Sequence, residues 1–152
     1  PFSVIAHMAL GLLLVSISFN SLLRTERALN IKINEYEEYK DLKIYFEDIR
    51  VLNNSNNDSI KATFVIQDLD GKKFNLSPEK RKYFTRGQIT TETAIHIMPL
   101  KDIYMTIGDQ LDDGSWIVNI QINYLIRFIW FSAALMAFAG IMLVFSNKRK
   151  QL

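Results

Sequence analysis

Two histidines and the absence of cysteine define the chemistry that this chain of 152 residues can carry. Without cysteine, no disulfide, thiolate metal site or thiol nucleophile can form. A glycine-rich phosphate loop and a G-x-S-x-G nucleophile motif are also absent, and the acidic residues are scattered without a pairing pattern. The two histidines, His7 and His96, are therefore the first residues to consider.

His7 lies in the uncharged apolar run Val4–Leu10, 17 residues before Arg24. Along a helix this distance is about 25 Å, which places His7 in the inner half of a membrane. An ionisable side chain at that depth is costly and marks a functional site. Neutral imidazole is an axial ligand of haem iron. The alternative is a structural histidine that is hydrogen-bonded to a neighbouring helix.

His96 lies between Ile95 and Ile97, in the part of the chain that we expect outside the membrane. Most of a membrane separates it from His7, so the two cannot bind one iron. If His7 binds a metal, its partner ligand comes from another chain. A single histidine among isoleucines is most often a strand residue, and we assign His96 no role.

Two segments without any Asp, Glu, Lys or Arg, Phe2–Leu23 and Phe128–Ser146, are 22 and 19 residues long. The hydrocarbon core of a bilayer is about 30 Å thick, so both are long enough to cross it as helices. No basic residue precedes the first segment and no A-x-A cleavage pattern follows it, which argues against a signal peptide. We therefore predict transmembrane helices over residues 1–23 and 124–146. Because Pro1 is not an initiator residue, we expect the chain to begin inside a longer protein.

The orientation of these helices follows from the flanking charges. The last residues, 147–152, contain Lys148, Arg149 and Lys150 and no acid, which indicates a cytoplasmic tail. Residues 24–123 then form an extracytoplasmic domain, whose 14 basic and 16 acidic residues give a net charge of −2. This balance does not favour nucleic-acid binding.

The outer segment carries the alternating pattern of half-buried strands. Three runs alternate or nearly alternate between apolar and polar residues: Leu29–Ile33, Leu42–Phe46 and Ala62–Ile66. Asp68–Lys72 and Asp112–Gly114 are hairpin signals, and Asn53–Ser59 is predicted to be a polar loop. The fold class is therefore a membrane protein in which two transmembrane α-helices flank a small antiparallel β-rich domain, either a barrel or a sandwich.

Two groups of basic residues have ordinary interpretations. Arg127, at the start of the second span, resembles a snorkelling cation beside the aromatic residues Tyr124 and Trp130. The cluster Lys80–Lys82 is by default a solvated surface. On an outer domain the same cluster is also suited to a haem propionate or an acidic partner.

Several motifs in this order resemble the C-terminal region of cytochrome c-type biogenesis proteins of the CcmF family (CcmF, NrfE and CcsA-like haem lyase subunits). They are Ser77–Tyr83, Thr90–Ile95, Lys101–Asp109, Gly114–Trp116, Arg127–Trp130 and Lys148–Lys150, and the pair Ala6-His7 resembles the start of a family membrane helix. The resemblance covers nearly the whole chain. Thr93, Lys101 and Asp109 are mild departures from the family pattern, and His96 stands where the family usually has another polar residue.

The resemblance implies covalent attachment of haem to the thiols of apocytochrome c on the outer side of a membrane. That membrane is the bacterial inner membrane with a periplasmic outer domain, or the mitochondrial inner membrane if the gene is organellar. The implied partners are the haem chaperone CcmE, apocytochrome c with its thiol-reducing partner, and the upstream half of the same protein or a split-gene partner. The implied cofactor is haem b, with His7 as one axial ligand and the second ligand outside this chain.

The family's tryptophan-rich loop and the two histidines that flank it lie upstream of Pro1, and the two tryptophans here, Trp116 and Trp130, belong to other motifs. We therefore expect a fragment or a split-gene product rather than a complete lyase. Two alternatives stay open. One is the paralogue dedicated to a nitrite-reductase cytochrome. The other is a two-span anchor with a partner-binding outer domain, in which His7 only packs.

Overall fold

The computed structural model describes residues 2–85 and 87–149. Along the described chain, one helix comes first, ten strands follow, and a second helix comes last. The elements are α1 (Phe2–Leu23), β1 (Thr25–Ile31), β2 (Tyr36–Tyr39), β3 (Leu42–Asn53), β4 (Asn57–Asp68), β5 (Lys73–Leu76), β6 (Glu79–Tyr83), β7 (Ile89–Glu92), β8 (Ala94–Ile97), β9 (Lys101–Gln110), β10 (Trp116–Tyr124) and α2 (Ile126–Arg149). The chain divides into two compact units, which are described separately.

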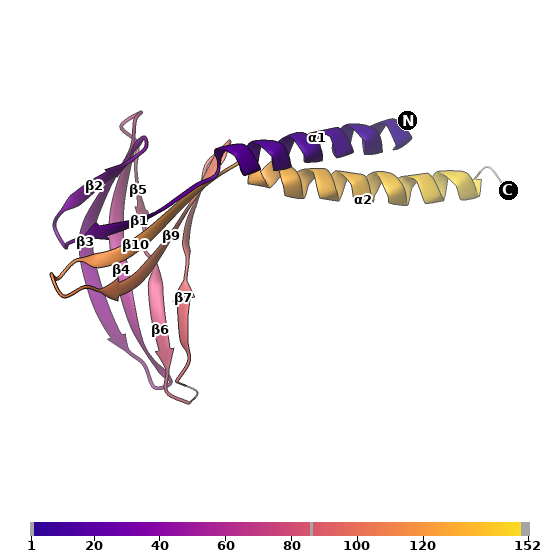
Figure 1. The fold of residues 1–152 in the computed structure, drawn as a ribbon. Helices are drawn as coiled ribbons and strands as arrows, with labels where there is room; N and C mark the ends of the chain where they lie inside the picture. Colours follow the sequence, from indigo (N-terminus) through magenta and orange to yellow (C-terminus); the bar gives the residue numbers. More distant parts are fainter. Residues whose placement is uncertain (1, 86, 150–152) are drawn as a thin grey trace. The chain divides into compact units, whose positions relative to one another are not determined.

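The first unit contains α1, α2 and the short segment Pro99–Asp102. The two helices pack along each other in antiparallel directions (Figure 1). Both are long and apolar enough to cross a membrane. Their most buried side chains are small and recur at a spacing of seven residues, which allows the helix backbones to approach closely. These side chains belong to Ala9 and Ser16 of α1 and to Ser132 and Ala139 of α2.

The second unit is a sandwich of two antiparallel sheets. One sheet has the strand order β1-β10-β9-β8, and the other has the order β2-β3-β4-β6-β7 with β5 also paired to β4 (Figure 1). The chain crosses between the sheets from β1 to β2 and again from β7 to β8. This architecture confirms the predicted fold class and resolves the choice between a barrel and a sandwich in favour of the sandwich.

The sandwich core is built from alternate residues of the long strands. Phe46 of β3 and Phe64 of β4 are cross-strand partners, are fully buried and stack with ring centroids 4.4 Å apart. From the other sheet, Met105 of β9 and Ile120 of β10 are also fully buried. Alternation places these apolar side chains on the inner faces of both sheets and leaves polar residues outside.

The turns are shorter than the sequence pattern predicts. The loop expected over Asn53–Ser59 is wrong in extent, because β3 continues to Asn53 and β4 begins at Asn57. Asn54 N–H donates to Asn57 O at 2.9 Å, so the polar asparagines close a tight turn between two paired strands. At the two hairpin signals, Gly71 and Gly114 adopt positive φ values of 75° and 83°, as their turns require.

Candidate functional site

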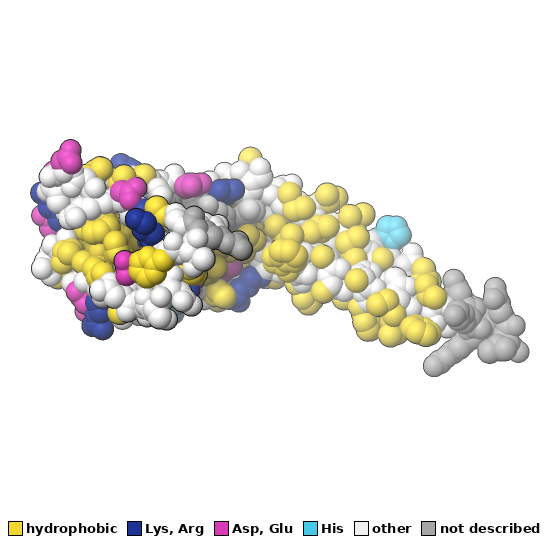
Figure 2. Space-filling view, turned by 90° about the horizontal axis from the view of Figure 1, so that it is seen from below, with side chains coloured by type: hydrophobic (Ala, Val, Ile, Leu, Met, Phe, Trp, Pro, Cys, Tyr) yellow, Lys and Arg dark blue, Asp and Glu magenta, His cyan; other side chains and the backbone are white. Residues whose placement is uncertain are grey.

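His7 occupies the face of α1 that points away from α2. It lies about 200° around the helix from Ala9 and about 180° from Ser16, the two residues buried against α2. Its side chain is exposed, and Figure 2 shows this histidine in cyan at the surface of the helix pair, among hydrophobic side chains. The helix pair therefore presents the imidazole outward.

A hydrogen bond within α1 fixes the ring of His7. Its Nδ1 lies 2.7 Å from the backbone oxygen of Ser3, one turn earlier. Since a carbonyl oxygen only accepts, Nδ1 must carry the proton and donate it. The other nitrogen, Nε2, then holds a free lone pair, and this is the tautomer that binds metals. The exposed imidazole thus has the tautomer of a metal-binding histidine.

Among the described residues, His7 is not part of a cluster of metal-binding His, Cys, Asp or Glu side chains. Among residues 2–85 and 87–149, no cluster of three or more His, Cys, Asp or Glu side chains could hold a metal ion. A haem iron needs only one protein ligand on each face of the porphyrin, so a lone outward imidazole fits a haem better than a metal ion bound by side chains alone.

Arg127 is more than a snorkelling cation, because it faces a buried carboxylate. Its Nε lies 3.6 Å from Oδ1 of Asp102, whose side chain is 7% exposed. Within the described residues this oxygen accepts no hydrogen bond, so the guanidinium provides its charge compensation. A cation in the first turn of a helix is unfavourable by itself, and Asp102 offsets that cost as well.

Two further bonds hold the same junction together. Tyr124 N–H donates to Oδ1 of Asn20 at 3.0 Å, and Leu125 N–H donates to the backbone oxygen of Leu100 at 2.9 Å. The end of α1, the segment Pro99–Asp102 and the start of α2 are therefore joined by polar contacts as well as by helix packing.

We expect Arg127→Ala to destabilise the chain by about 2–4 kcal/mol, because it leaves Asp102 buried and uncompensated. The double variant Arg127→Ala with Asp102→Asn should recover most of this loss. Chemical denaturation in detergent micelles measures both values. Equal destabilisation in the single and double variants would show that the charge pair is irrelevant.

The basic cluster Lys80–Lys82 is divided by the pleat of β6. Arg81 lies on the outer face of its sheet, where Nε is 2.8 Å from Glu79 Oε1 and Nη1 is 2.7 Å from Glu92 Oε1. Lys80 and Lys82 lie on the opposite, inner face. The sequence cluster is therefore not one basic patch, and Arg81 has a structural role.

Glu79 should make the domain sensitive to acid. The hydrogen bond from Arg81 is the largest cause that holds the pKa of Glu79 below its usual value. A carboxylate with a lowered folded-state pKa contributes stability above the ordinary glutamate pKa, about 4.3, and loses it as the pH falls through the folded value. Unfolding curves from neutral pH to about pH 3 should therefore fall less steeply in Glu79→Gln than in the wild type. Parallel curves would contradict this.

His96 lies in β8 and its ring stacks on Phe74 of β5, with centroids 3.7 Å apart and planes at 7°. Its ring is therefore used in a contact that joins the two sheets.

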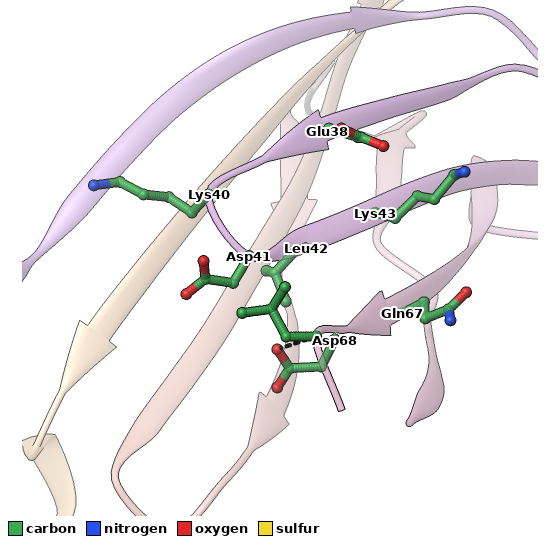
Figure 3. Close-up of a pocket in the computed structure, with 8 residues that line it drawn as sticks. Glu38, Lys40, Asp41, Leu42, Lys43, Gln67 and Asp68 are labelled. Atoms are coloured by element: carbon green, nitrogen blue, oxygen red, sulfur yellow. Dashed lines mark hydrogen bonds between the residues drawn. The ribbon is translucent and has the colours of Figure 1, made fainter. Parts of the chain in front are cut away.

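A hollow at the β2–β3 and β4–β5 turns is a poor candidate for a binding site. Its lining alternates in charge, with Glu38 and Asp41 beside Lys40 and Lys43. Figure 3 shows the two lysine side chains pointing to opposite sides and Asp68 bonded to its own turn.

Comparisons with known proteins agree with this architecture. Residues 22–123 match the family model of the CcmF C-terminal beta-sandwich. The chain is 29% identical to the cytochrome c-type biogenesis protein CcmF of Escherichia coli K12 over 97% of its own length, and 29% identical to that of Pseudomonas fluorescens over 91%. It is also 32% identical over 54% of its length to the biogenesis protein NrfE of Haemophilus influenzae.

A solved structure supports the fold as well. The cytochrome c haem lyase CcmF superposes with a TM-score of 0.74 at 15% identity, over 92% of this chain. Fold and site thus define a class of membrane protein in which apolar helices flank an antiparallel sandwich. Within that class, this chain belongs to the CcmF C-terminal beta-sandwich family. It spans 21–23% of the length of the CcmF relatives and of the solved structure named here.

Proposed function

We propose that this chain forms the C-terminal part of a cytochrome c haem lyase subunit and that His7 is an axial ligand of a membrane-embedded haem b. The observation that carries this proposal is the outward imidazole of His7, whose Nδ1–H is held by Ser3 O and whose Nε2 is left with its lone pair. Homology to CcmF supplies the biological setting.

When bound, such a haem supplies one-electron transfer, which suits the task of keeping a second, incoming haem iron reduced. The chain's own residues position this cofactor. Ser3 O fixes the tautomer and the orientation of His7, and the small residues of the α1–α2 contact fix the face of α1 that His7 occupies. The part of the protein upstream of this chain provides the second ligand and the opposite wall of the haem site.

The sandwich is proposed to lie on the periplasmic side of the inner membrane, with the basic residues Lys148, Arg149 and Lys150 in the cytoplasm. In that position it would help to shape the surface that receives apocytochrome c, its thiol-reducing partner and the haem chaperone CcmE. The thioether chemistry would belong to the haem and to the substrate thiols, and the protein would contribute binding and orientation.

Co-expression tests this proposal. The natural upstream sequence is expressed with or without this chain in cells that lack their own lyase subunit, together with a reporter cytochrome c. We expect covalently bound haem in the reporter, detected by peroxidase staining after denaturing electrophoresis, only when both parts are present. Equal haem attachment without this chain, at equal levels of the upstream part, would overturn the proposal.

The same experiment distinguishes the alternatives. A two-span anchor would leave haem attachment intact and reduce only the recovery of a partner in the membrane fraction. A lyase subunit dedicated to a nitrite-reductase cytochrome would mature that reporter and fail with a general cytochrome c. A panel with one reporter of each kind therefore identifies the substrate.

A further inference from the structure

The inner face of the sheet that contains β3, β4 and β6 extends beyond the part covered by the second sheet. On β3, Leu42, Ile44 and Phe46 are fully buried, but after the bulge between Phe46 and Asp48 the strand becomes exposed, and Val51 is 67% exposed. Val51 pairs with Ile60 of β4, and Ile60 pairs with Lys80 of β6. Cross-strand partners share one face of a sheet, so these residues form one row on the inner face.

A groove lies where the second sheet ends. Its volume is about 350 Å³, within the size range of small-molecule sites. The lining combines apolar side chains with two lysines and two aspartates: Val51, Ile60, Ile89, Trp116, Lys80, Lys82, Asp58 and Asp109. Figure 2 shows hydrophobic side chains gathered in a hollow of the sandwich, with basic and acidic side chains at its edge. An exposed apolar concavity of this kind marks a binding site more often than a chance surface.

The two lysines differ in whether their ammonium groups form an ion pair. The Lys80 side chain is mostly buried and its ammonium pairs with Asp109 of β9, across the groove. Lys82 is exposed and forms no ion pair within the described residues, although Asp58 is its cross-strand partner and also lines the groove. The groove therefore has an apolar floor and, at its rim, one cation available to an anion.

The indole of Trp116 provides a second polar group. Its Nε1 is buried and has no hydrogen-bond partner among the described residues. A buried donor without an acceptor costs free energy, which an acceptor from a bound molecule would recover after a small shift of the ring. Lys82 and Trp116 thus both favour a ligand that carries oxygen acceptors.

We propose that this groove binds an amphipathic carboxylate, with its apolar body on Val51, Ile60 and Ile89 and its carboxylate at Lys82. The lining contains no histidine, cysteine, methionine or tyrosine, the side chains that ligate haem iron, so a porphyrin would be held there by apolar contact and charge. Two sources share this chemistry, a porphyrin with its propionates and an aliphatic fatty acid. The site shares no residue with the one proposed at His7, so its failure would leave that proposal intact.

Fluorescence of Trp116 can report binding directly. In Trp130→Phe the indole of Trp116 is the only one in the chain. The 152-residue chain with this substitution is placed in nanodiscs. It is titrated with deuteroporphyrin IX, a metal-free porphyrin dicarboxylate, and separately with 8-bromooctanoate, whose bromine quenches at contact. We expect saturable quenching by at least one of them, and the one that binds more tightly identifies the source.

Matched variants separate groove binding from partition into lipid. Lys82→Ala should weaken binding about tenfold through loss of a charge-assisted contact. Asp58→Asn should tighten it by removing a like charge. Lys61→Ala, on the opposite face of β4, should leave it unchanged.

Unsaturable quenching by both compounds, or equal affinity in the Lys82 and Lys61 variants, would overturn the proposal. Val51→Asp, which polarises the groove floor without touching either lysine, should abolish binding and provides an independent check.

Discussion

His7→Ala is expected to remove haem b from the protein assembled with its upstream part. Loss of one axial ligand leaves the iron with at most one protein ligand, and the haem then depends on that ligand and on apolar contacts. The haem-to-protein ratio of the purified assembly, measured from the pyridine haemochrome spectrum, should fall severalfold. The bands of reduced b-type haem should weaken in parallel.

Two variants of α1 control for packing and for a substitute ligand. Leu14 is 57% exposed and lies two turns from His7 on the same face, so Leu14→Ala should retain the haem if ligation is what matters. Met8, which is 69% exposed, carries the other side chain near His7 that could bind iron, and Met8→Leu should also retain it. Haem loss in Leu14→Ala equal to that in His7→Ala would assign His7 to helix packing.

Phe64→Ala should destabilise the sandwich by about 3–5 kcal/mol, because it removes a large fully buried side chain and leaves a cavity beside Phe46. This is a large share of the total stability of an ordinary domain, about 5–15 kcal/mol. Urea unfolding, followed through Trp116 in the Trp130→Phe background, provides the measurement.

The matched control is Leu69→Ala at the tip of the β4–β5 turn. Leu69 is 77% exposed, so its removal should change the free energy of unfolding by less than about 0.5 kcal/mol. If Phe64→Ala and Leu69→Ala had similar effects, the core would not be where the two sheets place it.

The general architecture was predictable because membranes and sheets impose strict patterns on a sequence. Absence of charge over Phe2–Leu23 and after Arg127 leaves few structures other than spanning helices. Alternation in Leu42–Phe46 and Ala62–Ile66 assigns alternate residues to the sandwich core. Short turn motifs with glycine, at Gly71 and Gly114, locate two hairpins.

Features that depend on distant parts of the chain were not predictable in this way. The partner of Arg127 is Asp102, and nothing local in the sequence connects these two residues. Leu125 adopts a φ of +56° between β10 and α2, where sequence rules would favour glycine. The polar run Asn53–Ser59 looked like a loop, but pairing with neighbouring strands extended β3 and β4 into it.

The same limit applies to the candidate sites. Sequence singled out His7 by its depth, but only packing against α2 shows which face of α1 it occupies. The groove near Lys82 arises from an overhang of one sheet beyond the other, which no local pattern encodes. Successive side chains of a strand point to opposite faces, so a strand predicted over Lys80–Lys82 would place Lys80 and Lys82 on one face and Arg81 on the other. The sequence alone therefore allowed this division of the cluster to be predicted.

Rescue by free imidazole tests the proposed axial bond between His7 and haem iron. His7→Gly removes the imidazole and leaves a space that free imidazole can enter. We predict that the reduced assembly of His7→Gly lacks the bands of b-type haem when it is expressed and purified without imidazole, and shows them when imidazole is present throughout expression and purification. Unchanged bands in His7→Gly without imidazole would contradict the assignment of His7 as a haem ligand.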